Sequence, residues 1–257
     1  MLVIGEKLNS SIPSALHALT LDESEVIKLI KAQAEAGADY LDINTAMLGE
    51  DEYTKLEQTV KLALAYSELG IMPDSVNMQI IANILSLIGN RPTIINSISL
   101  SADTTPLQGL DLSNIGVIAM PTDEDGVPET PEKRIINISV LVERLIKLGF
   151  KAKNIYADVL IETTAVNQEA ALLALDTVRL VKKKLPDINT ICGATNISFG
   201  LPKRKYINAA FVAMAVYTGI DAMIIDIVNP DIKGALLASE LLSGRDEYCM
   251  NYIDAMR

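Results

Sequence analysis

Short apolar runs that alternate with longer amphipathic segments are the feature of this sequence that most restricts its fold. Runs with the composition of buried β-strands occur at residues 2–6, 40–44, 71–75, 93–97, 115–120, 155–159, 190–196 and 222–226. Segments with helical periodicity lie between most of them, at residues 23–36, 52–69, 77–88, 131–148, 167–184, 203–218 and 231–242. Parallel strands that are buried on both faces and joined by helices give this alternation. The pattern predicts the α/β class and a single (β/α)8 TIM barrel.

The length of the chain and its loops favour one domain. A chain of 257 residues has the size of one barrel, and no linker or low-complexity tract divides it, so we expect one domain over residues 1–257. Glycines stand where most predicted helices end, as left-handed C-cap positions prefer. They are Gly37, Gly70, Gly89, Gly149 and Gly219. The segment 99–114, between the fourth and fifth strands, has room for at most a short helix. An open, doubly wound sheet is the alternative architecture.

The charge and the cysteines restrict the partners and the setting. A net charge of -11 disfavours nucleic acid and anionic membranes as partners, because both repel an acidic surface. Cys192 and Cys249 form no C-x-x-C pair, which argues against a disulfide framework or a zinc–thiolate site and favours a reduced, cytoplasmic setting. The start of the chain has no signal-peptide pattern, and the longest apolar run, 209–220, is too short to span a bilayer. We expect neither a membrane span nor a bound metal.

Short polar side chains stand at the end of nearly every predicted strand, where a barrel gathers its catalytic groups. They are Glu6, Asn9, Asp42, Asn44, Asp74, Ser75, Asn77, Asn96, Ser97, Asp158, Asn196, Ser198, Asp226 and Asn229. Any single one of them could instead cap a helix or start a turn. The whole set is rich in Asn and Asp and contains no histidine, unlike the site of a hydrolase. It suits a flat, neutral heterocycle with several N–H donors and acceptors, such as a pterin.

Motifs along the whole chain resemble one family. IGEKLN (4–9), LDIN (41–44), PDSVN (73–77), INS (95–97), YADV (156–159), NISFGLPKRKYINAAF (196–211) and GIDAMIIDIVNP (219–230) follow in order. Together they resemble the pterin-binding methyltransferases of one-carbon metabolism, which move a methyl group between methyltetrahydrofolate and a corrinoid protein. The folate domain of cobalamin-dependent methionine synthase belongs to this group. The resemblance implies a methyltransferase with tetrahydrofolate or 5-methyltetrahydrofolate as substrate and a corrinoid (cobalamin) supplied by a partner protein.

The resemblance also implies roles for individual residues. The residues that would bind the pterin are Asp74, Asn96, Asp158, Gly193, Asn196, Ser198 and Arg204. Asn196 would be the catalytic amide, and Asp74 would share in the catalysis. Further candidates are Glu6, Asn9, Asp42, Asn44, Ser97 and Asp226. The sequence departs from the family pattern at Lys7, where arginine is usual, at Thr195, where serine is common, and at Met120-Pro121 after the fifth strand.

A mechanism follows from the chemistry of the methyl donor. The methyl group is attached to N5 of the pterin, and an amine anion is a poor leaving group. We expect Asn196 to donate a hydrogen bond to N5, most strongly in the transition state, where negative charge develops on that nitrogen. An amide is too weak an acid to supply the proton, which would come from solvent through a network that touches Asp74 or Ser198. Either direction of methyl transfer remains open.

Further features of the sequence lead to predictions about the corrinoid and the oligomeric state. His17 is the only histidine and lies in no Asp-x-His-x-x-Gly pattern, so the cobalt must come on a separate protein that docks at the barrel mouth. The resemblance implies a homodimer, and the predicted helix 203–218 is apolar on most sides, as expected beneath a second subunit.

Three other functions remain as alternatives. Dihydropteroate synthase is a related pterin-binding barrel, but the chain lacks its Asn-x-Thr-Pro-Asp-Ser-Phe loop and its late Ser-Arg-Lys signature. A non-catalytic folate-binding scaffold for a corrinoid protein would keep the cavity without turnover. A phosphate-binding barrel is suggested by Gly193, Gly200 and Gly234, although no phosphate-cradling pattern surrounds them.

Overall fold

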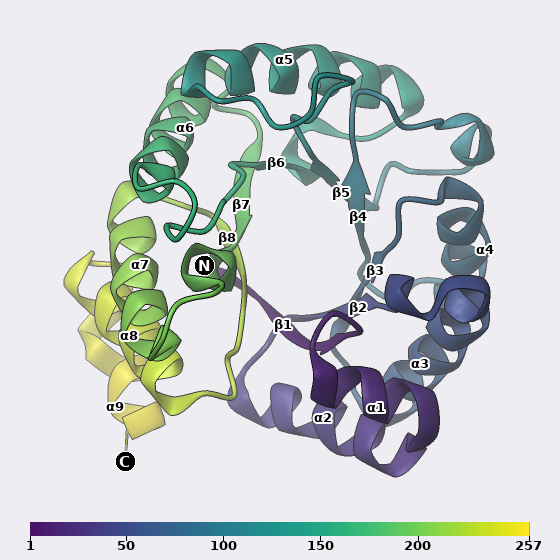
Figure 1. Ribbon diagram of the computed structural model, residues 1–257, viewed down its shortest axis with the longest axis horizontal. Helices are drawn as coiled ribbons and strands as arrows, with labels where there is room; N and C mark the ends of the chain where they lie inside the picture. The colour runs from purple at the N-terminus through teal and green to yellow at the C-terminus, as the bar shows by residue number, and fades with distance from the viewer. Residues whose placement is uncertain (257) are drawn as a thin grey trace.

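The computed structural model, which describes residues 1–256, contains a closed barrel of parallel strands (Figure 1). Each strand pairs with the next along the chain, and β8 closes the ring against β1. The strands are β1 (Leu2–Asn9), β2 (Tyr40–Asn44), β3 (Gly70–Asp74), β4 (Ile94–Ile98), β5 (Gly116–Ala119), β6 (Ile155–Asp158), β7 (Asn189–Gly193) and β8 (Ala222–Ile225). The predicted (β/α)8 TIM barrel is confirmed, and the open sheet is excluded because the ring closes.

Helices surround the barrel, as Figure 1 shows. The α-helices are α1 (Pro13–Leu21), α2 (Glu23–Ala36), α3 (Glu52–Tyr66), α4 (Met78–Ile88), α5 (Pro131–Leu148), α6 (Ala170–Lys184), α7 (Arg204–Thr218), α8 (Pro230–Leu242) and α9 (Met250–Met256). Short 3₁₀ segments are η1 (Ala46–Asp51), η2 (Thr105–Leu107), η3 (Ala152–Asn154), η4 (Ala194–Ser198) and η5 (Glu247–Cys249). The connection between β4 and β5 contains only η2, as predicted. Helix α1 was not predicted, although Pro13 at its first turn is a helix-start signal.

Most of the predicted helix-end glycines have positive φ. Gly37, Gly149 and Gly219 adopt the left-handed conformation at the ends of α2, α5 and α7. The prediction for Gly70 was wrong, because α3 already ends at Tyr66 and Gly70 begins β3. A Cβ atom at Gly70 would lie 2.3 Å from the Tyr40 ring, so the glycine makes room for neighbouring strand β2.

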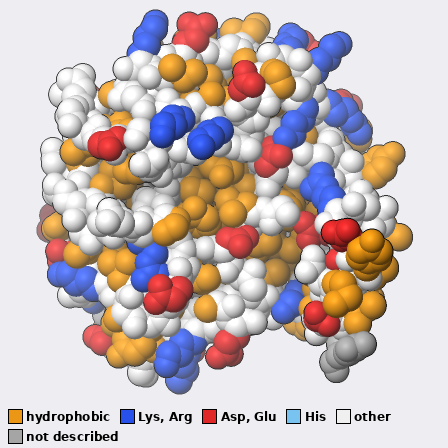
Figure 2. All heavy atoms as spheres, turned by 180° about the vertical axis from the view of Figure 1, so that it is seen from behind, with side chains coloured by type: hydrophobic (Ala, Val, Ile, Leu, Met, Phe, Trp, Pro, Cys, Tyr) orange, Lys and Arg blue, Asp and Glu red, His pale blue; other side chains and the backbone are white. Residues whose placement is uncertain are grey.

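The interior of the barrel is filled by apolar side chains from most of its strands. Ile4, Met72, Ile94, Ile118, Ile191 and Ala222 form one buried cluster, and Leu2, Tyr40, Tyr156 and Ile224 pack against it. Figure 2 shows the molecule from behind the view of Figure 1. Apolar side chains lie at the centre of this face, and charged side chains of both signs lie around them. Because this interior is packed, a ligand has room only above it, at the carboxyl ends of the strands. Within residues 1–256, no helix combines the length and apolar composition needed to cross a membrane.

The end of β7 differs from the prediction in a way that affects the site. The run 190–196 was predicted to be all strand, but β7 ends at Gly193 and the chain continues as η4. Ala194 and Ile197 turn into the apolar core, and the Ile197 carbonyl accepts hydrogen bonds from the backbone and side chain of Thr164, each at 3.0 Å. These contacts stabilise a turn instead of an extended strand. The turn carries Asn196 above the end of β7.

Candidate active site

A cavity of about 450 Å³ opens at the carboxyl ends of the strands. Most of the predicted site residues line it: Glu6, Asn9, Asp42, Asp74, Asn96, Ser97, Asp158, Gly193, Asn196 and Arg204. The predicted residues Asn44, Ser198 and Asp226 are not part of the lining. Other lining residues were not predicted as site residues: Ser11, Ile12, Pro13, Val76, Phe199 and Ile224. Met120 and Thr195 also line the cavity, although the sequence marked them only as departures from a family pattern. The volume is that of a small-molecule site.

Acidic side chains dominate the polar part of the cavity. Asp42 is enclosed, whereas Glu6, Asp74 and Asp158 are partly exposed to the cavity. Burial raises the pKa of Glu6 to about 7 and the pKa values of Asp74 and Asp158 to about 6. Burial and the nearby Asp74 raise the pKa of Asp42 well above its ordinary value. Crowded, poorly solvated carboxyl groups of this kind favour a ligand that brings N–H donors, because such donors stabilise the ionised form.

Two asparagines hold the acids in place. Asn44 Nδ2 donates to Asp74 Oδ2 at 2.7 Å, and Asn96 Nδ2 donates to Asp42 Oδ1 at 3.1 Å. The other amide atom of Asn44, Oδ1, accepts from the Ser10 hydroxyl at 3.0 Å. Asn44 therefore lies behind the cavity and orients Asp74. Asn96 both lines the cavity and orients a carboxyl group.

Asn196 stands beside a glycine that gives its amide room. A Cβ atom added at Gly193 would lie 3.0 Å from Asn196 Nδ2, closer than normal packing allows. The side chain of Asn196 is exposed, and among the hydrogen bonds of the described residues it makes none. The neighbouring Thr195 hydroxyl donates to Glu6 Oε2 at 2.8 Å and so connects η4 to β1. The Asn196 amide is therefore available to a ligand in the cavity.

Ser198 and Asp226 support the cavity from outside its lining, and Ser198 does so through the lining residue Arg204. The Ser198 hydroxyl accepts from Arg204 Nε at 3.0 Å, and Arg204 Nη2 donates to the Thr195 carbonyl at 2.8 Å. The guanidinium carbon of Arg204 lies 5.8 Å from the centre of the Phe199 ring. Asp226 forms an ion pair with Lys7 at 2.6 Å. Lys7, which departs from the family pattern, thus acts as the counter-ion of a β8 acid.

Some predicted polar residues serve the fold alone. Asn77 caps α4 by accepting from the backbone of Gln79 and Ile80, and Asn229 caps α8. His17 is exposed on α1 and does not line the cavity. Cys192 is buried in β7 among apolar neighbours, as predicted.

Comparisons of the sequence with a family model and with known proteins agree on one family. A family model described as pterin binding enzyme matches residues 6–226. The chain is 30% identical to the methylcorrinoid:tetrahydrofolate methyltransferase of Eubacterium limosum, over all of this chain and 96% of that protein. It is 27% identical to the methionine synthases of Mycobacterium tuberculosis and Mycobacterium leprae over 88% of this chain. This chain spans only 20% of the length of either methionine synthase.

Solved structures share the fold at low identity. Dihydropteroate synthase from Xanthomonas albilineans in complex with 7,8-dihydropteroate superposes with a TM-score of 0.74 and 16% identity, over 94% of this chain and 93% of that one. The Coxiella burnetii enzyme in complex with pteroic acid gives a TM-score of 0.71 and 14% identity, over 95% of this chain and 93% of that one. At this level of identity the likeness concerns the barrel architecture.

Proposed function

The chain belongs to the family of pterin-binding enzymes, and within it we propose that the protein transfers a methyl group between N5 of tetrahydrofolate and the cobalt of a corrinoid carried by a separate protein. The observation that carries this proposal is one cavity in which acids and amides from several strands converge with the Asn196 amide, which is unpaired among the described residues. The relative of nearly the same length from Eubacterium limosum, named for this reaction, supports it.

The acids and amides of the cavity match the polar edge of a pterin. Asp74 and Asp158 lie on different strands, so their carboxylates can accept from ring N–H groups on two sides of one flat ligand. Asn96 offers an amide between them in strand order. Because both carboxyl groups are poorly solvated when the cavity is empty, N–H donors from the ligand replace the missing water and stabilise their charge.

Asn196 is proposed to assist the bond change at N5. As the methyl group leaves for the cobalt, the electron pair of the C–N5 bond stays on nitrogen. A preorganised N–H donor is most effective where charge develops in the transition state. The Asn196 amide has no competing hydrogen bond among the described residues, and Gly193 leaves it room to turn toward the pterin.

The proton for N5 is proposed to come from solvent through a cavity carboxyl group. Ser198 is a poor route, because its hydroxyl accepts from Arg204 and lies 3.4 Å from the Thr195 carbonyl. Asp74 and Glu6 face the cavity, and their pKa values of about 6 and 7 mean that each is partly protonated near neutral pH. Either carboxyl group suits proton transfer at that pH.

The corrinoid is proposed to arrive on a partner protein that docks over the cavity. His17, the one histidine of the sequence, is exposed outside the lining and is not placed to hold a cobalt ligand above the pterin. Val76 and Phe199 line the mouth with 91% and 67% of their surface exposed, and they offer apolar contacts to such a partner. A cytoplasmic location stays a prediction of the sequence.

The reaction itself is tested with the purified protein and free substrates. Incubation with 5-methyltetrahydrofolate and cob(I)alamin should give methylcobalamin and tetrahydrofolate, and methylcobalamin with tetrahydrofolate should show the reverse reaction. Absorbance of the corrinoid and chromatography of the folate follow both directions. Tight folate binding without turnover in either direction would favour the scaffold function. Formation of dihydropteroate from a pterin pyrophosphate and p-aminobenzoate would favour the synthase function.

A homodimer is also proposed, with an apolar groove beside α7 as the contact. The groove, of about 350 Å³, is lined by Thr164, Ala171, Ile197, Tyr206, Ile207, Ala210, Phe211 and Met214. Ala210 is exposed within it, and a charge there would oppose burial beneath a second copy. We expect Ala210→Glu to convert the dimer to a monomer in light scattering. Ile136→Glu, on the exposed face of α5, is the control and should remain dimeric. A monomeric wild-type protein would refute the proposal.

A further inference from the structure

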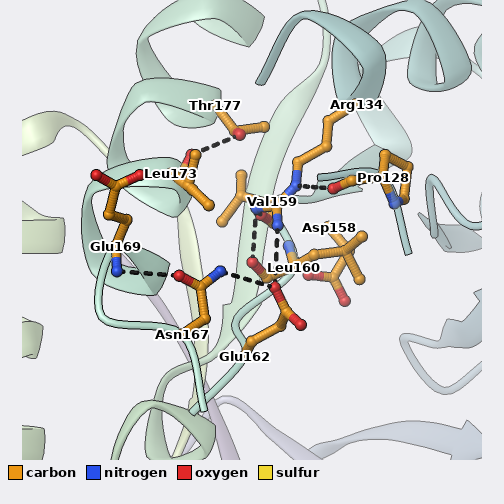
Figure 3. A network of polar contacts seen from close by, with 10 residues as sticks. All are labelled: Pro128, Arg134, Asp158, Val159, Leu160, Glu162, Asn167, Glu169, Leu173 and Thr177. Carbon is orange, nitrogen blue, oxygen red and sulfur yellow. Dashed lines mark hydrogen bonds and ion pairs between the residues drawn. The ribbon is translucent and has the colours of Figure 1, made fainter. Parts of the chain in front are cut away.

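A fully buried arginine lies directly behind the end of β6. Arg134, on α5, exposes 1% of its surface. Its Nη1 donates to the carbonyl oxygens of Val159 and Leu160 at 2.7 and 2.9 Å, and its Nε donates to the Pro128 carbonyl at 3.0 Å. Figure 3 shows the guanidinium reaching from α5 to the backbone that follows Asp158. One side chain thus ties the loop after β5 to the loop after β6.

The backbone that Arg134 holds has an unusual conformation. Leu160 has a positive φ of 51°, which a residue with a branched side chain adopts at a cost of about 1 kcal/mol or more. In this turn the Leu160 amide donates to Asp158 Oδ1 at 2.8 Å. The carbonyl groups of residues 159 and 160 meanwhile face the guanidinium. The hydrogen bonds from Arg134 therefore stabilise the same turn that presents the Asp158 carboxylate.

The charge of Arg134 is not consumed by a close ion pair. The nearest carboxylate, Glu162, lies 3.9 Å from Nη2 and is partly exposed. Its Oε2 also accepts from Asn167 Nδ2 at 3.3 Å. A buried guanidinium that mainly binds neutral carbonyl groups keeps an effective positive charge inside the protein, where screening is weak. That charge lies close enough to Asp158 to act on it.

We propose that Arg134 is a positioning residue of the pterin site, which fixes the turn at residues 158–160 so that the Asp158 carboxylate faces the cavity as a hydrogen-bond acceptor. Arg134 does not line the cavity, so it acts through Asp158. The claim that this acceptor binds a pterin rests on the proposed function. The claim that Arg134 positions Asp158 does not depend on that function.

The titratable and charged groups near Asp158 come from several elements. They are Arg134 from α5, Glu162 from the loop after β6 and the neutral Cys192 thiol from β7, while the acids Glu6, Asp42 and Asp74 from β1, β2 and β3 line the same cavity. Burial raises the pKa of Asp158 to about 6, while the Leu160 amide and the Arg134 charge oppose that rise. Loss of Arg134 weakens both opposing influences. The pKa of Asp158 must then rise further. The carboxyl group then stays protonated, and acts as a hydrogen-bond donor instead of an acceptor, up to a higher pH.

The experiment compares three variants of the full chain. Arg134→Met removes the charge, and Arg134→Lys keeps the charge without the planar guanidinium, whose Nη1 and Nε together bind three carbonyl groups. Arg144→Met is the matched control, because Arg144 also lies on α5 and donates to the backbone carbonyls of Leu100 and Ala102, in the loop after β4. Titration of ¹³C-labelled aspartate by NMR follows the Asp158 carboxyl group, whose signal is identified by its loss in Asp158→Asn. Calorimetry at pH 6 and pH 8 follows binding of 5-methyltetrahydrofolate.

Each variant has a distinct expected result. In Arg134→Met the Asp158 midpoint should rise by about one pH unit. Protonation alone then weakens folate binding about fivefold at pH 6 and hardly at pH 8. Misorientation of the turn adds a loss that persists at pH 8. Arg134→Lys should keep the midpoint close to that of the wild type and still show the pH-independent loss. Arg144→Met should change neither quantity.

The outcomes separate this proposal from the proposed function. If Arg134→Met leaves the Asp158 midpoint and the folate affinity at both pH values unchanged, the proposal is wrong. It is equally wrong if Arg144→Met shifts the midpoint as far, because general loosening of α5 would then explain the effect. If Arg134→Met does not fold, Arg134→Lys provides the test. A loss of folate affinity at pH 8 would then support the proposal, and unchanged affinity would refute it. A wild-type protein that binds no folate would remove the proposed function, while the NMR titration would still decide the role of Arg134.

Discussion

Replacing Asn196 by alanine is expected to slow methyl transfer by about 100- to 1000-fold, the usual effect of losing one preorganised hydrogen-bond donor at a developing negative charge. The Asn196 amide is exposed to the cavity and unpaired among the described residues, so its removal breaks no hydrogen bond between described residues. Folate affinity should change little, because the anchoring acids remain. Single-turnover stopped-flow measurements with saturating 5-methyltetrahydrofolate and cob(I)alamin give the rate.

Two further variants make this prediction specific. Asn189→Ala is the control, since Asn189 begins β7, at the end away from Asn196, and among the described residues its side chain donates only to the Lys153 carbonyl. Its rate should equal that of the wild type. Gly193→Ala should give an intermediate rate, because the new Cβ atom would press on the Asn196 amide from 3.0 Å. A rate for Asn196→Ala close to that of the wild type would remove this amide from the mechanism.

The sequence could predict the barrel and the ring of polar groups because both follow from one repeated pattern. Nearly every apolar run ends in a polar side chain, and a closed parallel barrel brings all of these ends to one side. The cavity therefore contains Glu6, Asp42, Asp74 and Asp158, as expected. The pattern does not show which side chains pair with one another. Asn44 illustrates this limit. It was a candidate ligand-binding residue, but it lies outside the cavity lining and donates a hydrogen bond to Asp74.

Other parts of the site carried no signal in the sequence pattern. Val76 and Phe199 are single apolar residues in loops, and only the three-dimensional arrangement places them at the mouth. The predicted strand 190–196 ran too far because Ala194 is as apolar as a strand residue, although Ala194 and Ile197 pack as one side of a 3₁₀ turn. Arg134 was missed for the opposite reason. An arginine on an amphipathic helix normally faces solvent, and the burial of Arg134 depends on carbonyl groups of two loops.

Replacing Asp158 by asparagine should weaken binding of 5-methyltetrahydrofolate by about 10- to 100-fold, because a ring N–H donor then faces an amide that cannot accept at both of its atoms. The rate of methyl transfer at saturating folate should fall much less, since Asn196 is untouched. Calorimetry measures the affinity and stopped-flow mixing the rate. Asp176→Asn, an exposed change on α6, is the control and should bind folate normally. Unchanged affinity of the Asp158 variant would exclude this carboxyl group as an anchor.

The pH dependence of binding provides an independent check on the same residue. The pKa of Asp158 is raised from 3.8 to about 6 in the folded protein, and only the ionised form accepts hydrogen bonds at both oxygens. Its contribution to folate affinity should therefore be present above pH 6 and be lost as the pH falls through that value. Asp74, whose pKa is also about 6, contributes in the same range and titrates in both proteins. The ratio of the two dissociation constants, variant over wild type, then isolates Asp158. It should fall about tenfold from pH 8 to pH 5. A ratio that stays constant with pH would mean that Asp158 acts through the shape of the cavity and not through its charge.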